Sequence, residues 1–289
     1  MCVVISRIQL IAAALLFSTG GAAIKATGFN SWQTAGFRSA IAAAALLALL
    51  PEARRLAGWR TWLTGAAYAS TLVLFVHSTK LTTSANAIFL QSTAPAYMLV
   101  FGPLLLKEKL QRLDYWLTLA LACGMGLFFA GTENPVATAP DPVRGNIYAA
   151  FSGLAWALTL AGLRRQGKRN LAVVVAGNVL AFVLCLPQAL PVAQVTTADV
   201  GVILYLGLIQ IGFAYWLLTR GLRNVPAFEA STLLMLEPVA NPTWTWLMHG
   251  EQPSAWALAG GAVILGSTLG RVWMDRGPGL NPRARSSPS

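Results

Sequence analysis

The feature that most restricts the fold of this chain is a series of long apolar runs separated by short polar loops. A helix needs roughly 20 apolar residues to cross a bilayer, and a spanning backbone must satisfy its own hydrogen bonds. Because the runs are continuous and do not alternate with polar residues, they predict transmembrane helices and not a barrel. Ten runs can be marked, at 8–26, 32–50, 61–78, 83–104, 115–131, 146–163, 171–190, 200–218, 227–248 and 255–274.

The charge distribution agrees with a multi-pass membrane protein. Only 11% of the residues are charged and 56% are hydrophobic, whereas soluble domains carry about 25% charged residues. The net charge of +11 comes from basic residues in the loops, so we interpret it as a topology signal and not as nucleic-acid binding. With a cytoplasmic N-terminus, 17 of the 21 basic residues fall on the cytoplasmic side, as the positive-inside rule requires. We therefore expect an inner-membrane protein with both termini cytoplasmic.

The two halves of the chain contain a repeated pattern. Pro95 stands 13 residues before Glu108, and Pro238 stands 13 residues before Glu251, so the two copies are offset by 143 residues. Two halves of five helices each must be inverted relative to one another because five is odd. Inverted repeats are typical of secondary transporters, whose site lies at the repeat interface. The predicted division is a first five-helix repeat at 1–131, a linker at 132–145, a second repeat at 146–274 and a disordered cytoplasmic tail at 275–289.

On these motifs the chain resembles the EamA type of the drug/metabolite transporter superfamily. The resemblance covers about residues 8–274 and is carried by Pro95 with Lys107-Glu108, Pro238 with Gly250-Glu251, Phe17 and Lys25 in the first run, and Trp156 in the sixth. It implies an all-α membrane protein of ten helices in two inverted repeats that moves a small metabolite. It does not identify the metabolite.

Glu237 is the most conspicuous residue, since it lies near the middle of the run 227–248. A charge there costs about 2.5–3.5 kcal/mol on insertion scales, so we expect the side chain to face a cavity or a partner. Asn241 follows at i+4 on the same helix face. Pro238 and its equivalent Pro95 weaken their helices, and we interpret them as hinges. Two interpretations of Glu237 stay open: a proton site or anchor for a substrate ammonium, and a structural carboxylate paired with a buried Arg or Lys.

Further polar and aromatic residues within the runs are candidates for a binding cavity. Gln91 and Gln210 could each line it or form hydrogen bonds between helices. Trp156 and Tyr97 could contribute aromatic walls suited to a partly apolar ligand, with ordinary packing as the alternative.

Two basic residues lie within or at the end of apolar runs. Arg38 and Lys25 could each bind a substrate carboxylate. For Arg38 we favour a structural ion pair or a gate. For Lys25 we favour snorkelling to the outer interface. Glu108 and Glu251 fall in loops, where a structural role at helix ends is the better interpretation.

The sequence offers no sign of a cofactor or a metal. His77 and His249 have no second ligand at a metal-binding spacing, and the three cysteines lie far apart. The phosphate-binding pattern GxxxxGK[ST] is absent, so any energy for transport must come from a gradient or from the substrate.

The leading hypothesis is a secondary transporter, with an amphiphile such as an amino acid as its small-molecule partner. We expect export by alternating access, and not enzymatic activity. The alternatives are a lipid or multidrug flippase or efflux protein, or an intramembrane enzyme, although no GxSxG or HExxH pattern supports an enzyme. The protein is expected to contact lipid as a monomer or homodimer. The Gly266–Gly270 pair permits close helix packing, which we expect to lie within the monomer.

Overall fold

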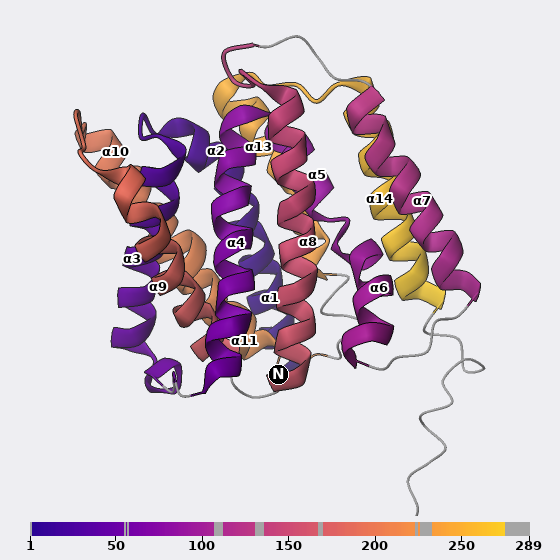
Figure 1. The fold of residues 1–289 in the computed structure, drawn as a ribbon, viewed down its shortest axis with the longest axis horizontal. Coiled ribbons are helices and arrows are strands. Elements are labelled where there is room, and N and C mark those ends of the chain that lie inside the picture. Colours follow the sequence, from indigo (N-terminus) through magenta and orange to yellow (C-terminus); the bar gives the residue numbers. More distant parts are fainter. Residues whose placement is uncertain are drawn as a thin grey trace, which may run out of the picture.

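The structure is a computed structural model built from helices joined by short connections (Figure 1). It describes residues 2–54, 56, 58–106, 112–130, 136–166, 170–222, 225 and 233–274. Within these ranges, strand-like pairing is confined to one isolated bridge between Val136 and Ala139. The expectation of an all-α fold is confirmed.

The described part of every predicted apolar run contains helix. The first half forms α1 (Cys2–Ser18), α2 (Gly20–Ala26), α3 (Ser31–Leu49), the 3-10 helix η1 (Pro51–Arg54), α4 (Trp59–Leu81), α5 (Ser84–Gln91), α6 (Ala94–Leu106) and α7 (Arg112–Ala130). The second half forms α8 (Pro142–Gln166), α9 (Asn170–Ala189), α10 (Thr197–Leu204), the π-helix η3 (Tyr205–Phe213), α11 (Ala214–Gly221), α13 (Leu236–His249) and α14 (Ala255–Met274).

Several of these helices suit a membrane. Four stretches are long and apolar enough to cross one, namely Val4–Ala26, Pro142–Leu163, Leu171–Ala189 and Thr197–Gly221. Large apolar side chains also cover the outer surface, including Leu104, Trp116 and Leu247. Soluble monomers rarely expose extended apolar patches, so a lipid environment explains this surface.

Some of the predicted runs contain broken helices. The fourth run is interrupted at Ser92–Thr93, between α5 and α6, and the ninth is interrupted at Met235, before α13. The breaks lie just before Pro95 and Pro238. Proline is tolerated in the first turn of a helix because the N–H groups there have no intrahelical acceptor. The proline pattern seen in the sequence therefore marks the start of a second helical segment.

Small residues let the central helices approach closely. A Cβ atom added to Gly177 of α9 would lie 2.8 Å from the carbonyl oxygen of Gly65 in α4, and one added to Gly162 of α8 would lie 2.5 Å from the Thr64 side chain. Close approach of backbones through small residues is the usual basis of helix packing in membranes. Helices α8 and α9 thus both pack against α4, which occupies the middle of the bundle (Figure 1).

Helices α7 and α14 form a pair at one side of the bundle (Figure 1). Their contact is made by Gly124 and Gly260, where an added Cβ on Gly260 would lie 2.9 Å from the Gly124 carbonyl oxygen. Gly266 and Gly270, in contrast, have no described atom within 4 Å of an added Cβ. The expectation that they pack within the monomer is therefore not supported by the described residues.

The packing predicts a clear difference between two glycine substitutions. We expect Gly177→Ala to destabilise the protein by about 1–3 kcal/mol, the usual cost of overpacking, since the methyl group meets backbone that cannot rotate away. Gly266→Ala is the matched control and should leave stability unchanged or slightly raised. Thermal unfolding in detergent measures both, and equal melting temperatures would contradict the packing described for α4 and α9.

Candidate functional site

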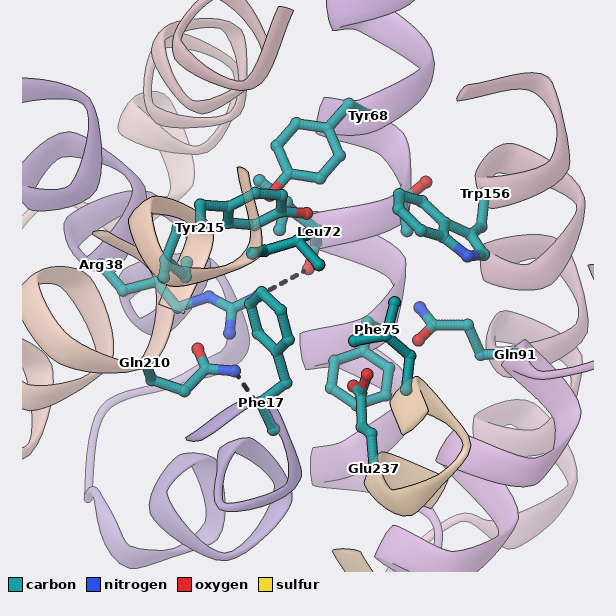
Figure 2. Close-up of a pocket in the computed structure, with 14 residues that line it drawn as sticks. Phe17, Arg38, Tyr68, Leu72, Phe75, Gln91, Trp156, Gln210, Tyr215 and Glu237 are labelled. Atoms are coloured by element: carbon teal, nitrogen blue, oxygen red, sulfur yellow. Dashed lines mark hydrogen bonds between the residues drawn. The ribbon is translucent and has the colours of Figure 1, made fainter. Parts of the chain in front are cut away.

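A cavity of about 160 Å³ lies at the centre of the bundle. Helices of both halves of the chain contribute to it (Figure 2). Its lining consists of Phe17, Arg38, Tyr68, Thr71, Leu72, Phe75, Gln91, Trp156, Gln210, Ile211, Tyr215, Leu218, Leu234 and Glu237. Five of the predicted binding residues are thus brought together, namely Arg38, Gln91, Trp156, Gln210 and Glu237.

One wall of the cavity is a single face of α4. Its members Tyr68, Thr71, Leu72 and Phe75 follow the spacing i, i+3, i+4, i+7, which places them on one side of a helix. Sequence reasoning missed this wall. The available signal was a tyrosine and a threonine at helical spacing within an otherwise apolar run.

Arg38 enters the cavity from α3 and is almost fully buried, with 2% of its surface exposed. One Nη2–H donates to the Leu72 carbonyl oxygen at 3.3 Å, while Nε has no partner. No ion pair with a described carboxylate is formed, so the expected structural ion pair is not found within the described part of the chain. Within the described part of the chain, the arginine is thus held by its packing among the helices and by this hydrogen bond, with Nε unsatisfied.

Gln210 lies beside Arg38 on the π-helix η3 (Figure 2). Its Nε2 donates to the Phe17 carbonyl oxygen at 3.4 Å, and its buried Oε1 has no partner. Gly207 allows η3 to approach α3, since an added Cβ would lie 2.9 Å from the Arg38 carbonyl oxygen. Short π-helical segments are frequent at functional sites. This one was not foreseen, because the hydrophobic pattern does not distinguish it from an α-helix.

Glu237 points into the cavity from the first turn of α13 (Figure 2). The break at Met235 explains how a carboxylate can stand there. It places Glu237 in the first turn of a new helix, where the helix dipole favours negative charge. Among the described residues Glu237 has neither a hydrogen bond nor an ion pair. The alternative of a carboxylate paired with a buried Arg or Lys is therefore not found there.

Aromatic rings and amides complete the walls. Tyr215 forms edge-on contacts with Phe17 and Tyr68, with ring centroids 5.1 and 5.9 Å apart. On the opposite side, Trp156 lies near Gln91 (Figure 2), whose Nε2 donates to Ser152 Oγ at 2.7 Å. Gln91 thus has both of the roles considered for it, since it lines the cavity and forms a hydrogen bond between helices.

Three predicted site residues lie outside this cavity. Asn241 is fully buried and accepts a hydrogen bond from Ser84 Oγ at 2.6 Å, because the i+4 position turns toward α5. Tyr97 donates to the Ala150 carbonyl oxygen at 3.2 Å. Lys25 is buried in an ion pair. The side chains of these three residues therefore lie between packed segments of the protein and not in the cavity.

The ion pair of Lys25 lies at the end of the bundle opposite the N-terminus. Its Nζ is 2.5 Å from Glu251 Oε2, and the two side chains are 5% and 4% exposed. Nζ also donates to the carbonyl oxygens of Thr82 and Thr138, while Glu251 Oε1 accepts from Ser84 N at 2.5 Å. The expectation that Lys25 snorkels to the interface is wrong, because this ion pair and the two carbonyl oxygens hold the ammonium inside.

The same end carries a second polar cluster. Asp199 Oδ1 accepts from Gly28 N at 2.7 Å and from Thr27 Oγ1 at 3.0 Å, and Lys80 Nζ donates to the Thr27 carbonyl oxygen at 2.6 Å. Together with Lys25 and Glu251, these contacts join α2, α4, α5, α10 and the loop after α13. This end of the bundle is closed by polar contacts between both halves of the chain.

The described residues contain no group of His, Cys, Asp and Glu side chains placed to hold a metal ion. His77 Nδ1 contacts the Val73 carbonyl oxygen at 2.9 Å, and His249 Nε2 contacts that of Ala22 at 2.9 Å. Glu108, the other loop glutamate considered from the sequence, lies outside the described residues.

Apolar helices of membrane length around a small cavity with buried charges define a polytopic membrane protein of the transporter class. The chain belongs to the EamA-like transporter family, within the drug/metabolite transporter superfamily, and the family matches residues 5–130 and 143–272. The resemblance seen in the sequence is confirmed. The protein is a multi-pass protein of the inner membrane.

Curated relatives share part of the chain. The pseudopaline exporter CntI of Pseudomonas aeruginosa is 25% identical over 191 residues, which is 63% of each protein. The uncharacterized transporter YoaV of Bacillus subtilis is 26% identical over 180 residues, covering 60% of this chain and 61% of YoaV. The matches therefore span less than two thirds of these relatives. A crystal structure 19% identical, covering 94% of this chain and 97% of its own, has a TM-score of 0.64 and supports the fold alone.

The buried pair of Lys25 and Glu251 predicts strong energetic coupling. We expect Lys25→Met to cost about 3–5 kcal/mol, because it leaves a buried carboxylate without its partner. Glu251→Gln keeps the oxygen that accepts from Ser84 N and removes only the charge. The double substitution should cost less than the sum of the two single ones.

A double-mutant cycle of thermal or denaturant unfolding measures this coupling. Arg54→Gln is the control, since Arg54 is exposed and donates to the carbonyl oxygens of Leu47 and Ala48, far from the ion pair in sequence. Additive effects of the Lys25 and Glu251 substitutions would mean that the ion pair does not contribute to stability.

Proposed function

We propose that this protein is a secondary transporter that exports amino acids or related small amphiphiles across the inner membrane. The observation that carries the proposal is the central cavity, in which helices of both halves surround two groups of opposite charge, the buried Arg38 and the partly buried Glu237. Its volume is below the roughly 300–1,000 Å³ of pockets for drug-sized ligands, which favours a small substrate. Convergent polar groups favour a polar metabolite over a lipid.

The proposed topology has ten transmembrane helices in two inverted repeats, with both termini in the cytoplasm. Repeats at 1–131 and 146–274, a linker at 132–145 and a cytoplasmic tail at 275–289 fit the two segments matched by the family. The helix breaks at Ser92 and Met235 support the repeat, since they are separated by the same 143 residues as the two prolines.

Alternating access would use these breaks. In this proposal Pro95 and Pro238 lie at hinges, where two short helical segments can change their relative angle at little cost in hydrogen bonds. The polar contacts around Lys25 and Glu251 close one end of the bundle and would have to separate for the cavity to open there. Half-helices that end near the bilayer midplane are a recurring element of transporter sites.

Export is supported by likeness to the pseudopaline exporter. Coupling is assigned to Glu237, a partly buried carboxylate in the cavity without a partner among the described residues. A proton on this group would neutralise it during the passage through the membrane interior, where an unpaired charge is costly. We propose no enzymatic role, no cofactor and no nucleic-acid partner, and the working unit is a monomer or homodimer in lipid.

Transport into proteoliposomes tests this function. Uptake of a panel of labelled amino acids is measured with and without a pH gradient, for the wild type and for Glu237→Gln. We expect gradient-stimulated uptake by the wild type only, with exchange of substrate across the membrane retained in the variant, because the amide keeps the shape of the carboxyl group but carries no proton.

Glu52→Gln is the matched control, since Glu52 lies in the exposed helix η1, and it should behave as the wild type. Equal uptake by wild type and Glu237→Gln, independent of the gradient, would remove Glu237 from the coupling mechanism. No uptake of any amino acid would refute the proposed substrate.

A further inference from the structure

Two groups of opposite charge, the buried Arg38 and the partly buried Glu237, line one cavity without contacting each other. Arg38 projects from α3 and Glu237 from α13, on different sides of the space (Figure 2). Both residues are described, and no ion pair within 4 Å joins them. Removing one partner of a buried pair is strongly unfavourable because a charge is left uncompensated. A cavity lined by two separate charges therefore points to a ligand that supplies a partner for each of them.

The arginine has the donors that such a ligand needs. A guanidinium carries five N–H donors in a planar fork, and Arg38 uses one hydrogen bond, to the Leu72 carbonyl oxygen. The side chain is 2% exposed and its Nε is unsatisfied. A planar carboxylate fits this fork with two parallel hydrogen bonds. The absence of any described carboxylate next to Arg38 leaves that position for the substrate.

The opposite charge is provided by Glu237. Its carboxylate faces the cavity (Figure 2), where it can accept hydrogen bonds from a substrate ammonium. Gln210 Oε1 is a further buried acceptor without a partner. The rings of Phe17, Phe75 and Trp156 also line the cavity, and they provide an apolar surface for a side chain of modest size.

We propose that Arg38 and Glu237 select the substrate as a zwitterion, with the carboxylate bound by Arg38 and the ammonium by Glu237. This inference rests on the transport function proposed above and assigns Arg38 as a specificity-determining residue of the same site. A zwitterion neutralises both charges at once. An amine or a carboxylic acid of the same shape neutralises only one, and the other stays unpaired.

Binding of matched ligands to the purified full-length protein tests the selection. Isothermal titration calorimetry in detergent compares leucine with 3-methylbutylamine, which lacks the carboxylate, and with 4-methylpentanoate, which lacks the ammonium. The zwitterion 5-aminopentanoate covers a larger separation of the charges. We expect one or both zwitterions to bind at least 10-fold more tightly than the amine and the acid.

Variants of the protein then show which residue binds the carboxylate of the ligand and which binds the ammonium. In Arg38→Gln, affinity for the zwitterion should fall about 10- to 100-fold, the range for a lost hydrogen bond to a charged group, while affinity for the amine is unchanged or higher. In Glu237→Gln, binding of the zwitterion should weaken while binding of the acid should not. Arg38→Lys keeps the charge but loses the fork, so an intermediate affinity separates ligand binding from collapse of the fold. Arg54→Gln is the exposed control.

Equal affinities for zwitterion, amine and acid would overturn the inference, as would absence of binding by both zwitterions, or parallel losses for all ligands in Arg38→Gln. Failure of the transport proposal can be distinguished from failure of this inference. If proteoliposomes carry an amine or an acid without zwitterion preference, transport stands and the selection by Arg38 and Glu237 falls. If zwitterions bind with the expected preference but no transport is detected, the selection stands and the transport function falls.

Discussion

The cost of burying charge in a low-dielectric interior governs the arrangement of this protein. Away from water an ionised group needs an opposite charge, hydrogen bonds, or both. Lys25 and Glu251 meet this requirement within the chain, and their contacts join α2, α5 and the loop after α13. Arg38 meets it only in part, by donating to the Leu72 carbonyl oxygen, and Glu237 meets it with no described residue, although both line the central cavity. Satisfied charges thus fasten one end of the bundle, and unsatisfied charges mark the space that a ligand would occupy.

Broken helices make the cavity physically possible. The break at Met235 begins a new helix, α13, with Glu237 in its first turn, where the helix dipole favours a negative charge. On the other side of the cavity, Gly207 lets the π-helix η3 approach the backbone of Arg38. Irregular backbone is tolerated at this depth only where it is covered by protein or lines a cavity. The irregular segments of α13 and η3 both contribute to the cavity wall, as this constraint demands.

Much of the fold could be predicted because helix in a membrane follows from apolar length alone. The runs gave the helical segments and the proline spacing gave the position of the breaks. The site was harder to predict, since the direction in which a side chain points depends on how the helices cross. Glu237 and Asn241 share a helix face by spacing, yet Asn241 turns to Ser84. Lys25 was assigned to the interface because its partner Glu251 lies 226 residues away in sequence. The wall of α4 was overlooked because tyrosine and threonine are common in packing and carry no charge to attract attention.

The same physics connects the cavity to movement between two states. A carrier that selects a ligand by pairing its charges must also release it, and tight pairing in every state would trap the ligand. In the proposed mechanism the two charges lie on different helices, Arg38 on α3 of the first half and Glu237 on α13 of the second. Rocking of the halves would change the distance between them, so that both contacts can form in one arrangement and only one in another. Protonation of Glu237 would weaken the second contact in the same direction. In this proposal the separation of the charges on two halves serves more than recognition, because it would make the affinity for the ligand depend on the conformation of the protein.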